Sequence, residues 1–172
     1  MAVHIRSWMR YLDWILSTPL MLFSLAFFFE HRRVFVARGG ISDPSAVFRA
    51  PGILGVFVFN NVMLFFGWAL ERTILCLPSR RQLLAGGFIA FVGSFASLFT
   101  YVDANDAVSN AVFWSTAVVW SLYGVAAALP YVEQQVTYNL VDIVSKNGYG
   151  IFVTVYASLH VPVGAPAAES TL

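Results

Sequence analysis

Five hydrophobic segments, separated by short polar connections, make up most of this chain. A helix needs about 20 mainly apolar residues to cross the hydrocarbon core of a membrane. Phe, Val, Leu and Ala dominate all five segments, which run over residues 3–29, 47–70, 82–101, 107–129 and 133–160. Because hydrocarbon offers no hydrogen-bond partners, a spanning segment must satisfy its own backbone groups, which favours helices. The pattern therefore predicts five transmembrane helices.

Polar and turn-forming residues lie between these segments and at the end of the chain. Residues 31–46 hold a basic run and then a Ser-Asp-Pro turn, and Pro130 separates the last two segments. A single helical bundle is therefore predicted over residues 1–160. The remaining residues, 161–172, are rich in Pro and Ala and are predicted to be disordered.

Composition agrees with a membrane protein. The chain is 59% hydrophobic and 11% charged, whereas soluble domains carry about 25% charged residues. These values predict an all-α, multi-pass integral membrane protein, in the plasma membrane or another cell membrane and surrounded by lipid. The formal net charge of +1 gives no reason to expect a nucleic-acid partner.

Lys146, the only lysine of the chain, lies inside the last apolar segment, and Asp142 precedes it by four residues. Residues four apart share one face of a helix. A charge in hydrocarbon is costly, so such a lysine is rarely incidental. Two interpretations follow: Lys146 forms a buried ion pair, or its amine loses a proton and condenses with a carbonyl compound.

A second group of polar residues lies in the first segment, within RYLDWILSTPL. Arg10, Asp13 and Ser17 are spaced three and four residues apart, so they line one stripe of the helix. The formal charges of Arg10, Asp13, Asp142 and Lys146 sum to zero. A neutral cluster between helices suits a low dielectric. Charge alone leaves open whether this cluster is structural or functional.

Aromatic residues add to the functional interpretation. Trp120 and Tyr123 lie three residues apart on the fourth segment, within WSLYG, and Trp14 on the first segment is able to oppose them. Large flat rings around a lysine suit a planar, conjugated ligand. The alternative is that these rings belong to an interfacial belt or to the core.

Together, three stretches resemble the microbial (type 1) rhodopsins. RYLDWILSTPL resembles the third helix of that family, and WSLYG resembles its sixth, which usually reads W-S-x-Y-P. LVDIVSKNGYG resembles the seventh helix, with its D-x-x-x-K motif. Order and spacing fit over residues 3–160. The five predicted helices thus match helices three to seven of a seven-helix bundle.

The resemblance implies that Lys146 binds all-trans retinal covalently as a Schiff base. It implies that Asp13 and Asp142 are the counterions and that Arg10 sets their charge and hydrogen bonding. Light would isomerise the retinal, and the Schiff-base proton would then pass to Asp13. Ser17, one turn along the helix, would form a hydrogen bond with Asp13.

The resemblance also implies a pocket around the retinal. Trp14 and Trp120 would clamp the polyene, and Tyr123 would close the pocket and form a hydrogen bond with Asp142. A hydrogen bond between Thr18 and Asn60 would link two helices, a contribution of roughly 1 kcal/mol. No metal ligands are predicted. The residues expected to line the pocket are Trp14, Thr18, Met63, Gly67, Trp120 and Tyr123.

The sequence departs from the family pattern in several places. The first two family helices have no counterpart, so their part of the counterion network is absent or comes from another chain. Ser24 stands where proton pumps usually place a carboxylic acid. Gly124 replaces the usual proline, Ala127 stands where a tryptophan is common, and the segment at 82–101 lacks any tryptophan.

The leading functional hypothesis is a light-driven proton pump, because anion pumps of the family have a neutral residue in place of Asp13. A light-gated channel or a photosensor with a slow photocycle is the alternative, since Ser24 is a poor proton donor. A membrane scaffold without photochemistry, a truncated remnant and an incomplete sequence also remain open. None of these is an enzyme. The expected partners are retinal, membrane lipids and either a second copy of the chain or a chain that supplies the missing helices.

Overall fold

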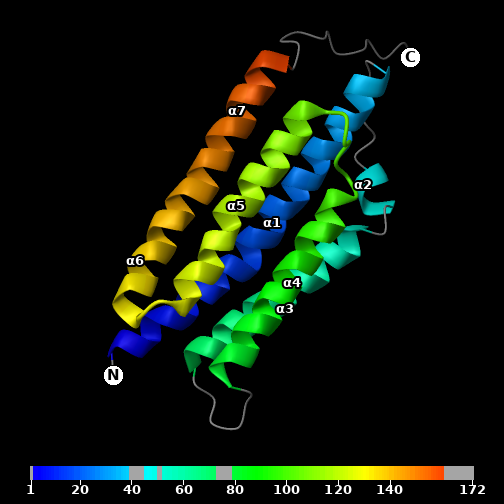
Figure 1. Cartoon of the computed structure of the whole chain (residues 1–172). Helices are drawn as coiled ribbons and strands as arrows, with labels where there is room; N and C mark the ends of the chain where they lie inside the picture. Colours follow the sequence, from blue (N-terminus) through cyan, green and yellow to red (C-terminus); the bar gives the residue numbers. More distant parts are fainter. Residues whose placement is uncertain (1, 39–44, 50–51, 73–78, 161–172) are drawn as a thin grey trace, which may run out of the picture.

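The computed structural model describes residues 2–38, 45–49, 52–72 and 79–160, and these residues form a bundle of helices (Figure 1). The last span is built from three consecutive helical pieces, of which the middle one is π-helical. The elements are α1 (Ala2–Arg38), α2 (Ser45–Arg49), α3 (Gly52–Arg72), α4 (Arg80–Phe99), α5 (Ala107–Ala128), α6 (Tyr131–Asp142), η1 (Ile143–Gly148) and α7 (Tyr149–His160).

Four of the described helices are each long and apolar enough to cross a membrane. The spans are Met9–Phe35, Gly52–Glu71, Arg80–Phe99 and Ala107–Ala128. The fifth predicted span is present as α6, η1 and α7, with 12, 6 and 12 residues. At about 1.5 Å per residue these reach roughly 45 Å, enough to cross a hydrocarbon core of about 30 Å. The predicted all-α membrane bundle is confirmed, with a π-helical turn inside its last span.

The first helix is longer than predicted, since α1 continues to Arg38 and does not end near residue 29. Two arginines in the added part of the helix form ion pairs. Arg33 forms an ion pair of 2.7 Å with the buried Glu30 one turn earlier, and Arg32 forms one with Asp106. Because these charges are paired, the basic run does not require a loop.

The second predicted helix, over residues 47–70, is divided in the structure. α2 ends at Arg49 and α3 begins at Gly52. Pro51, just before α3 in the sequence, has no backbone N–H and disfavours a helical conformation in the residue before it. The predicted disorder of residues 161–172 falls outside the described part of the chain.

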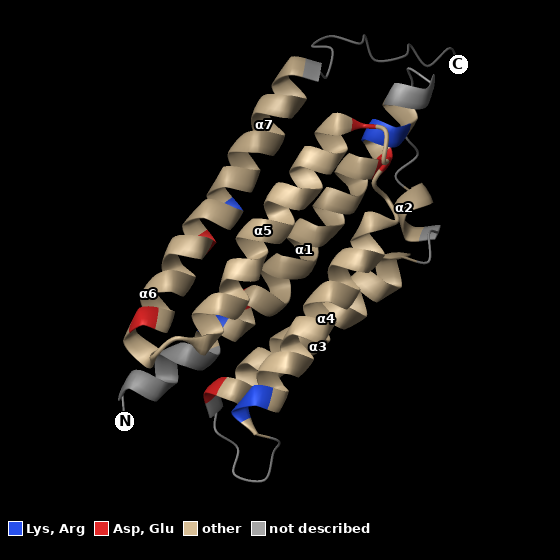
Figure 2. Cartoon of the chain, viewed as in Figure 1, with Lys and Arg blue, Asp and Glu red and all other residues tan. Residues whose placement is uncertain are grey.

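α1 packs against α3, α3 pairs with α4, and α5 contacts both α4 and α6 (Figure 1). Two buried clusters fill the space between the helices. One contains Leu22, Phe95 and Phe113, and the other surrounds Trp14 and Tyr138. Figure 2 shows that acidic and basic residues gather at the two ends of the bundle and, away from those ends, between α6 and α7.

Close packing of α3 on α4 depends on small residues. A Cβ atom added at Gly52 would lie 2.9 Å from the Ser97 carbonyl oxygen, and one at Gly55 would lie 2.4 Å from the Ser97 hydroxyl oxygen. Glycine at both positions therefore lets the two backbones approach, as is common where helices meet in membranes.

The predicted hydrogen bond between Thr18 and Asn60 is present and joins α1 to α3. The Asn60 side-chain amide donates to the Thr18 hydroxyl oxygen over 2.9 Å, and that hydroxyl donates to the Trp14 carbonyl over 2.7 Å. Both side chains are buried. The bond therefore lies in the interior, where an unpaired amide is costly.

Replacing Thr18 with valine should lower the free energy of unfolding by roughly 1 to 2 kcal/mol, because the buried Asn60 amide loses its acceptor. Equilibrium unfolding in mixed micelles with increasing SDS measures this change. Thr154→Val is the matched control, because among the described residues the exposed Thr154 hydroxyl donates only to the Gly150 carbonyl of its own helix. Equal losses in the two variants would contradict an interhelical role for Thr18.

Candidate functional site

The structure brings the lysine of η1 against carboxylates from two helices. Lys146 Nζ lies 2.5 Å from Asp13 Oδ2 on α1 and 3.7 Å from Asp142 Oδ1 at the end of α6. Lys146 sits in a π-helical turn, a feature that is frequent at functional sites. The predicted grouping of one amine with two carboxylates is therefore present.

The two carboxylates have different surroundings. Asp142 accepts a hydrogen bond of 2.6 Å from the Tyr123 hydroxyl, as predicted, and the Trp14 indole N–H approaches its two oxygens at 3.2 and 3.3 Å. Among the described side chains, the only hydrogen-bond donor to Asp13 is Lys146. Asp142 is thus held in place by neutral donors, whereas Asp13 keeps free acceptor positions.

Arg10 does not contact either carboxylate directly. Its Nη2 donates to the Asn139 side-chain oxygen over 3.0 Å, and its guanidinium carbon lies 5.0 Å from the Tyr138 ring and 5.7 Å from the Trp14 ring. No described ion pair joins Arg10 to Asp13 or Asp142. Stacking on aromatic rings is a stable alternative for a guanidinium. The effect of Arg10 on the charge of the carboxylates stays a prediction.

The predicted hydrogen bond between Ser17 and Asp13 is not formed. The Ser17 hydroxyl is buried and has no hydrogen-bond partner among the described residues. The Asp13 side chain is 59% exposed and turns toward Lys146. Residues on one helical stripe can thus differ in where their polar atoms point.

An apolar cavity adjoins the charged group. Five of the predicted pocket residues line it: Trp14, Met63, Gly67, Trp120 and Tyr123. Thr18 and Lys146 are not among its lining residues. Trp14 and Tyr123 line the cavity and also donate hydrogen bonds to Asp142, so the same two side chains contact both the cavity and this carboxylate.

Sequence reasoning missed the wall that α4 contributes to this cavity. Phe88 and Phe91 line the cavity together with Gly87. Gly124 and Ala127 on α5 also line it, and a Cβ atom at Gly124 would lie 2.4 Å from the Phe88 ring. Small residues on α5 therefore make room for phenylalanines of α4, which occupy the wall that lacks a tryptophan. The Gly-Gly-Phe-x-x-Phe pattern at residues 86–91 was not a sufficient signal, because it also suits helix packing.

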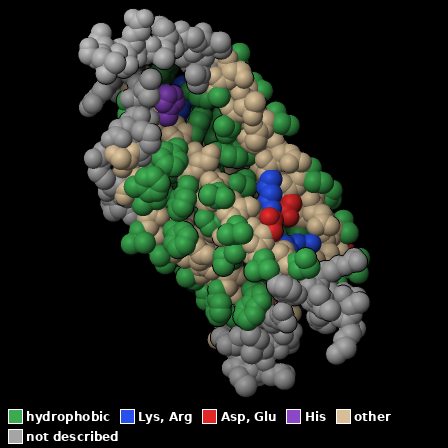
Figure 3. All heavy atoms as spheres, turned by 180° about the vertical axis from the view of Figure 1, so that it is seen from behind, with side chains coloured by type: hydrophobic (Ala, Val, Ile, Leu, Met, Phe, Trp, Pro, Cys, Tyr) green, Lys and Arg blue, Asp and Glu red, His purple; other side chains and the backbone are tan. Residues whose placement is uncertain are grey.

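The charged group lies on an apolar outer face. Exposed fractions are 59% for the side chain of Asp13, 27% for Lys146 and 23% for Asp142. Figure 3 shows basic and acidic side chains grouped among hydrophobic ones on this side of the molecule. On α1 the exposed neighbours of Asp13 are Met9, Leu12, Leu16 and Leu20.

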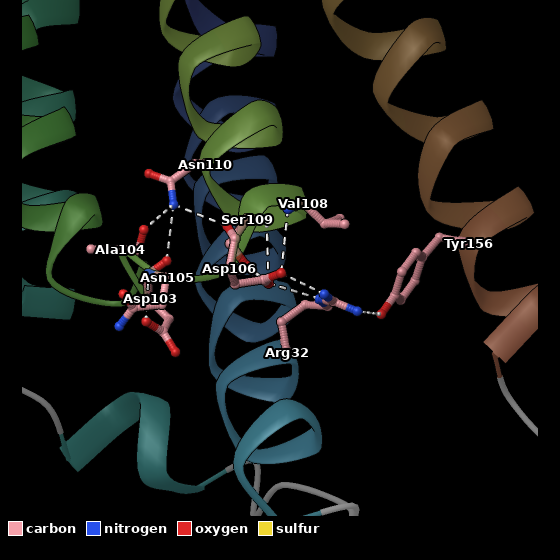
Figure 4. A network of polar contacts seen from close by, with 9 residues as sticks. All are labelled: Arg32, Asp103, Ala104, Asn105, Asp106, Val108, Ser109, Asn110 and Tyr156. Atoms are coloured by element: carbon pink, nitrogen blue, oxygen red, sulfur yellow. Dashed lines mark hydrogen bonds and ion pairs between the residues drawn. The ribbon is translucent and has the colours of Figure 1, made fainter.

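A second polar network lies at the end of the bundle where α5 begins (Figure 4). Arg32 donates two hydrogen bonds to Asp106, over 2.9 and 2.5 Å, and a third to the Tyr156 hydroxyl over 3.2 Å. Asp106 also caps α5 by accepting from the Val108 and Ser109 backbone amides and from the Ser109 hydroxyl. Arg32 therefore links three helices: α1, α5 and α7.

This network predicts a pH dependence of stability. The hydrogen bonds from Arg32, and then those from Ser109 and the Val108 backbone, lower the pKa of Asp106 well below its usual range. A lowered pKa in the folded state stabilises the protein above the ordinary aspartate pKa of about 3.9, and this stabilisation is lost as the pH falls below that value.

Asp106→Asn should thus lower the free energy of unfolding by about 2 to 3 kcal/mol from pH 7 to pH 5, with a smaller difference below pH 4. Asparagine still caps a helix, so the loss reports the charge. Unfolding curves of both proteins at each pH measure it. A difference that grows on acidification would contradict the assignment.

Comparison with known proteins supports the same fold. Residues 2–159 match the family model described as bacteriorhodopsin-like protein. The crystal structure of viral rhodopsin OLPVRII is similar, with a TM-score of 0.71 and 26% sequence identity over 87% of this chain. This chain spans 66% of the length of that structure. No curated protein matches the chain. The match over nearly the whole chain, together with four apolar spanning helices, shows that this integral, multi-pass membrane protein belongs to the bacteriorhodopsin-like protein family.

Proposed function

We propose that this chain is a retinal-binding photoactive membrane protein, with all-trans retinal bound covalently to Lys146 as a Schiff base. The observation that carries the proposal is the position of Lys146 Nζ, 2.5 Å from Asp13 and 3.7 Å from Asp142. A protonated nitrogen in apolar surroundings needs nearby carboxylates to keep its charge.

The residues around Lys146 fit a long, planar, apolar group. The neighbouring cavity is lined by two tryptophans and by Met63 and Gly67, and a Cβ atom at Gly67 would lie 3.2 Å from the Tyr11 hydroxyl. Lys146 itself points toward Asp13 and does not line this cavity. Binding therefore requires its flexible side chain to turn from Asp13 toward the cavity.

The two carboxylates would have different roles. Retinal, when bound, supplies absorption of visible light and an isomerisation that moves the attached nitrogen. Asp13 is the proposed proton acceptor, because it is closest to Nζ and has free acceptor positions. Asp142 is the less available acceptor, because it already accepts hydrogen bonds from the Tyr123 hydroxyl and the Trp14 indole N–H.

A proton acceptor at Asp13 favours a light-driven proton pump. A light-gated channel or photosensor with a slow photocycle is the second candidate. The observation that favours it is Ser24, whose hydroxyl lies 2.7 Å from the Tyr149 hydroxyl where pumps of the family usually place a carboxylic acid. Neither hydroxyl readily gives up a proton at neutral pH.

The exposed charges also imply a neighbour in the membrane. Asp13 and Lys146 on an apolar outer face would cost several kcal/mol against hydrocarbon. Further transmembrane helices, from a second copy or from another chain, would remove this cost by covering the face. The scaffold hypothesis also predicts such a partner, so association alone does not decide between the two.

Adding all-trans retinal to membranes that contain the chain tests the proposal. A visible absorption band that is absent without the chain is the expected result. Illumination in unbuffered vesicles should then change the external pH. A band without a pH change would exclude the pump and leave the channel and the sensor. Folded protein without a band would contradict retinal binding and favour the scaffold.

A further inference from the structure

A second cavity, separate from the one described above, lies between α5 and the η1–α7 segment. Its volume of about 230 Å³ far exceeds the ~10–15 Å³ that one water molecule needs. Trp120 lines both cavities, and its buried indole N–H has no hydrogen-bond partner among the described residues. The hydroxyl-bearing residues of its wall are Ser115, Thr116, Ser145 and Tyr149. These side chains give water polar contacts within a mainly apolar lining.

The second cavity reaches the lysine-bearing turn from a different side than Asp13 does. Ser145, which immediately precedes Lys146, is part of its wall, and the other wall is α5. Asp13 approaches Lys146 from α1. Water in this cavity would therefore lie beside the turn that carries Lys146, on a different side from Asp13.

The end of this cavity lies beside the network of Figure 4. Phe152 lines the cavity, and its ring centroid is 6.0 Å from that of Tyr156 on the next turn of α7. Tyr156 accepts the hydrogen bond from Arg32, whose guanidinium carbon lies 5.9 Å from the tyrosine ring. Arg32 and Asp106 are mostly buried, with side chains 12% and 6% exposed. Arg32 thus ties the beginning of α5 to α7 beside the cavity.

We propose that Arg32, Asp106 and Tyr156 form a latch that holds α5 and α7 together and restricts the entry of water into the second cavity. The latch itself does not depend on retinal. Its consequence rests on the proposed function: water admitted here would return a proton to Lys146 Nζ and leave hydroxide, which exchanges with the solvent. Such a route would replace the carboxylic acid that Ser24 lacks.

Thiol labelling of the chain without retinal tests the latch. In a Cys76→Ser background, Thr116→Cys places a reporter in the cavity wall for a charged, water-soluble methanethiosulfonate. Arg32→Gln should increase its labelling rate about tenfold, because strong charge-assisted hydrogen bonds are lost. Arg33→Gln is the matched control: it removes the neighbouring ion pair to Glu30 and should leave the rate unchanged.

Three results would overturn the latch: an unchanged rate in folded Arg32→Gln, an equal increase in both variants, or unrestricted labelling of the parent protein. If Arg32→Gln does not fold, Tyr156→Phe keeps the ring and removes one hydrogen bond, and it should give a smaller increase. In the retinal-bound protein, Arg32→Gln should speed recovery of the dark state. If the chain gave no visible band with retinal, the proposed function would be wrong. The labelling experiment, which needs no retinal, would still test the latch.

Discussion

Replacing Lys146 with alanine is expected to abolish the visible absorption band that all-trans retinal produces with the unaltered chain. Alanine has no amine, so a covalent imine cannot form at this position. Removal of Lys146 also leaves Asp13 without its only described donor, so the variant should be less stable. Absorption spectra of purified protein, together with unfolding curves, separate the two effects.

Lys146→Arg provides the control for this prediction. Arginine keeps the positive charge beside Asp13 and Asp142, but its guanidinium does not form a stable imine. The arginine variant should therefore recover stability without recovering the band. If arginine restored the band, retinal would be bound elsewhere. If neither variant changed the spectrum, Lys146 would be only a member of an ion pair.

Asp13→Asn is expected to preserve the visible band and to reduce the light-induced pH change at least tenfold. Asparagine cannot take up the proton from Nζ, and Asp142 lies farther away at 3.7 Å and already accepts hydrogen bonds from Tyr123 and Trp14. Flash-induced pH changes in vesicles measure the effect. A tenfold loss corresponds to about 1.4 kcal/mol of barrier.

Ser17→Ala is the matched control on the same stripe of α1. Because the Ser17 hydroxyl makes no hydrogen bond to Asp13, its removal should leave the pH change within about twofold of the parent. A full pH change in Asp13→Asn would show that the proton acceptor is another group. A large loss in Ser17→Ala would instead show that Ser17 forms the hydrogen bond with Asp13 that the family resemblance implied.

Local periodicity predicted the contacts that depend on helix geometry. Asp142 and Lys146 share a face because they lie four residues apart. The contact between Tyr123 and Asp142 and the bond between Thr18 and Asn60 were implied by the family resemblance. Both also agree with the tendency of polar residues in membranes to pair. In these cases spacing and the cost of an unpaired polar group lead to the same answer.

Periodicity could not predict contacts that depend on how helices rotate and end. Arg10 donates a hydrogen bond to Asn139, which is 129 residues away in the sequence, and among the described residues it does not pair with Asp13 or Asp142 as the predicted cluster required. α1 continues to Arg38, and within this continuation Arg32 forms an ion pair with Asp106, 74 residues further along the chain. The phenylalanine wall of α4 depends on the small size of Gly124. Each of these outcomes is decided by a distant partner.

The ion pair between Asp13 and Lys146 also has a consequence for biosynthesis. The two residues are 133 positions apart, so α1 is synthesised long before its compensating charge exists. Asp13 lies near the start of the apolar span Met9–Phe35, where a charge costs less than the roughly 2.5 to 3.5 kcal/mol of an aspartate at the centre of a helix. The apolar residues of α1 can therefore carry the span into the membrane, but Asp13 stays without the Lys146 ammonium until the last span is made. The final packing of the first span thus depends on completion of the last, and interrupted synthesis should leave Asp13 without this partner.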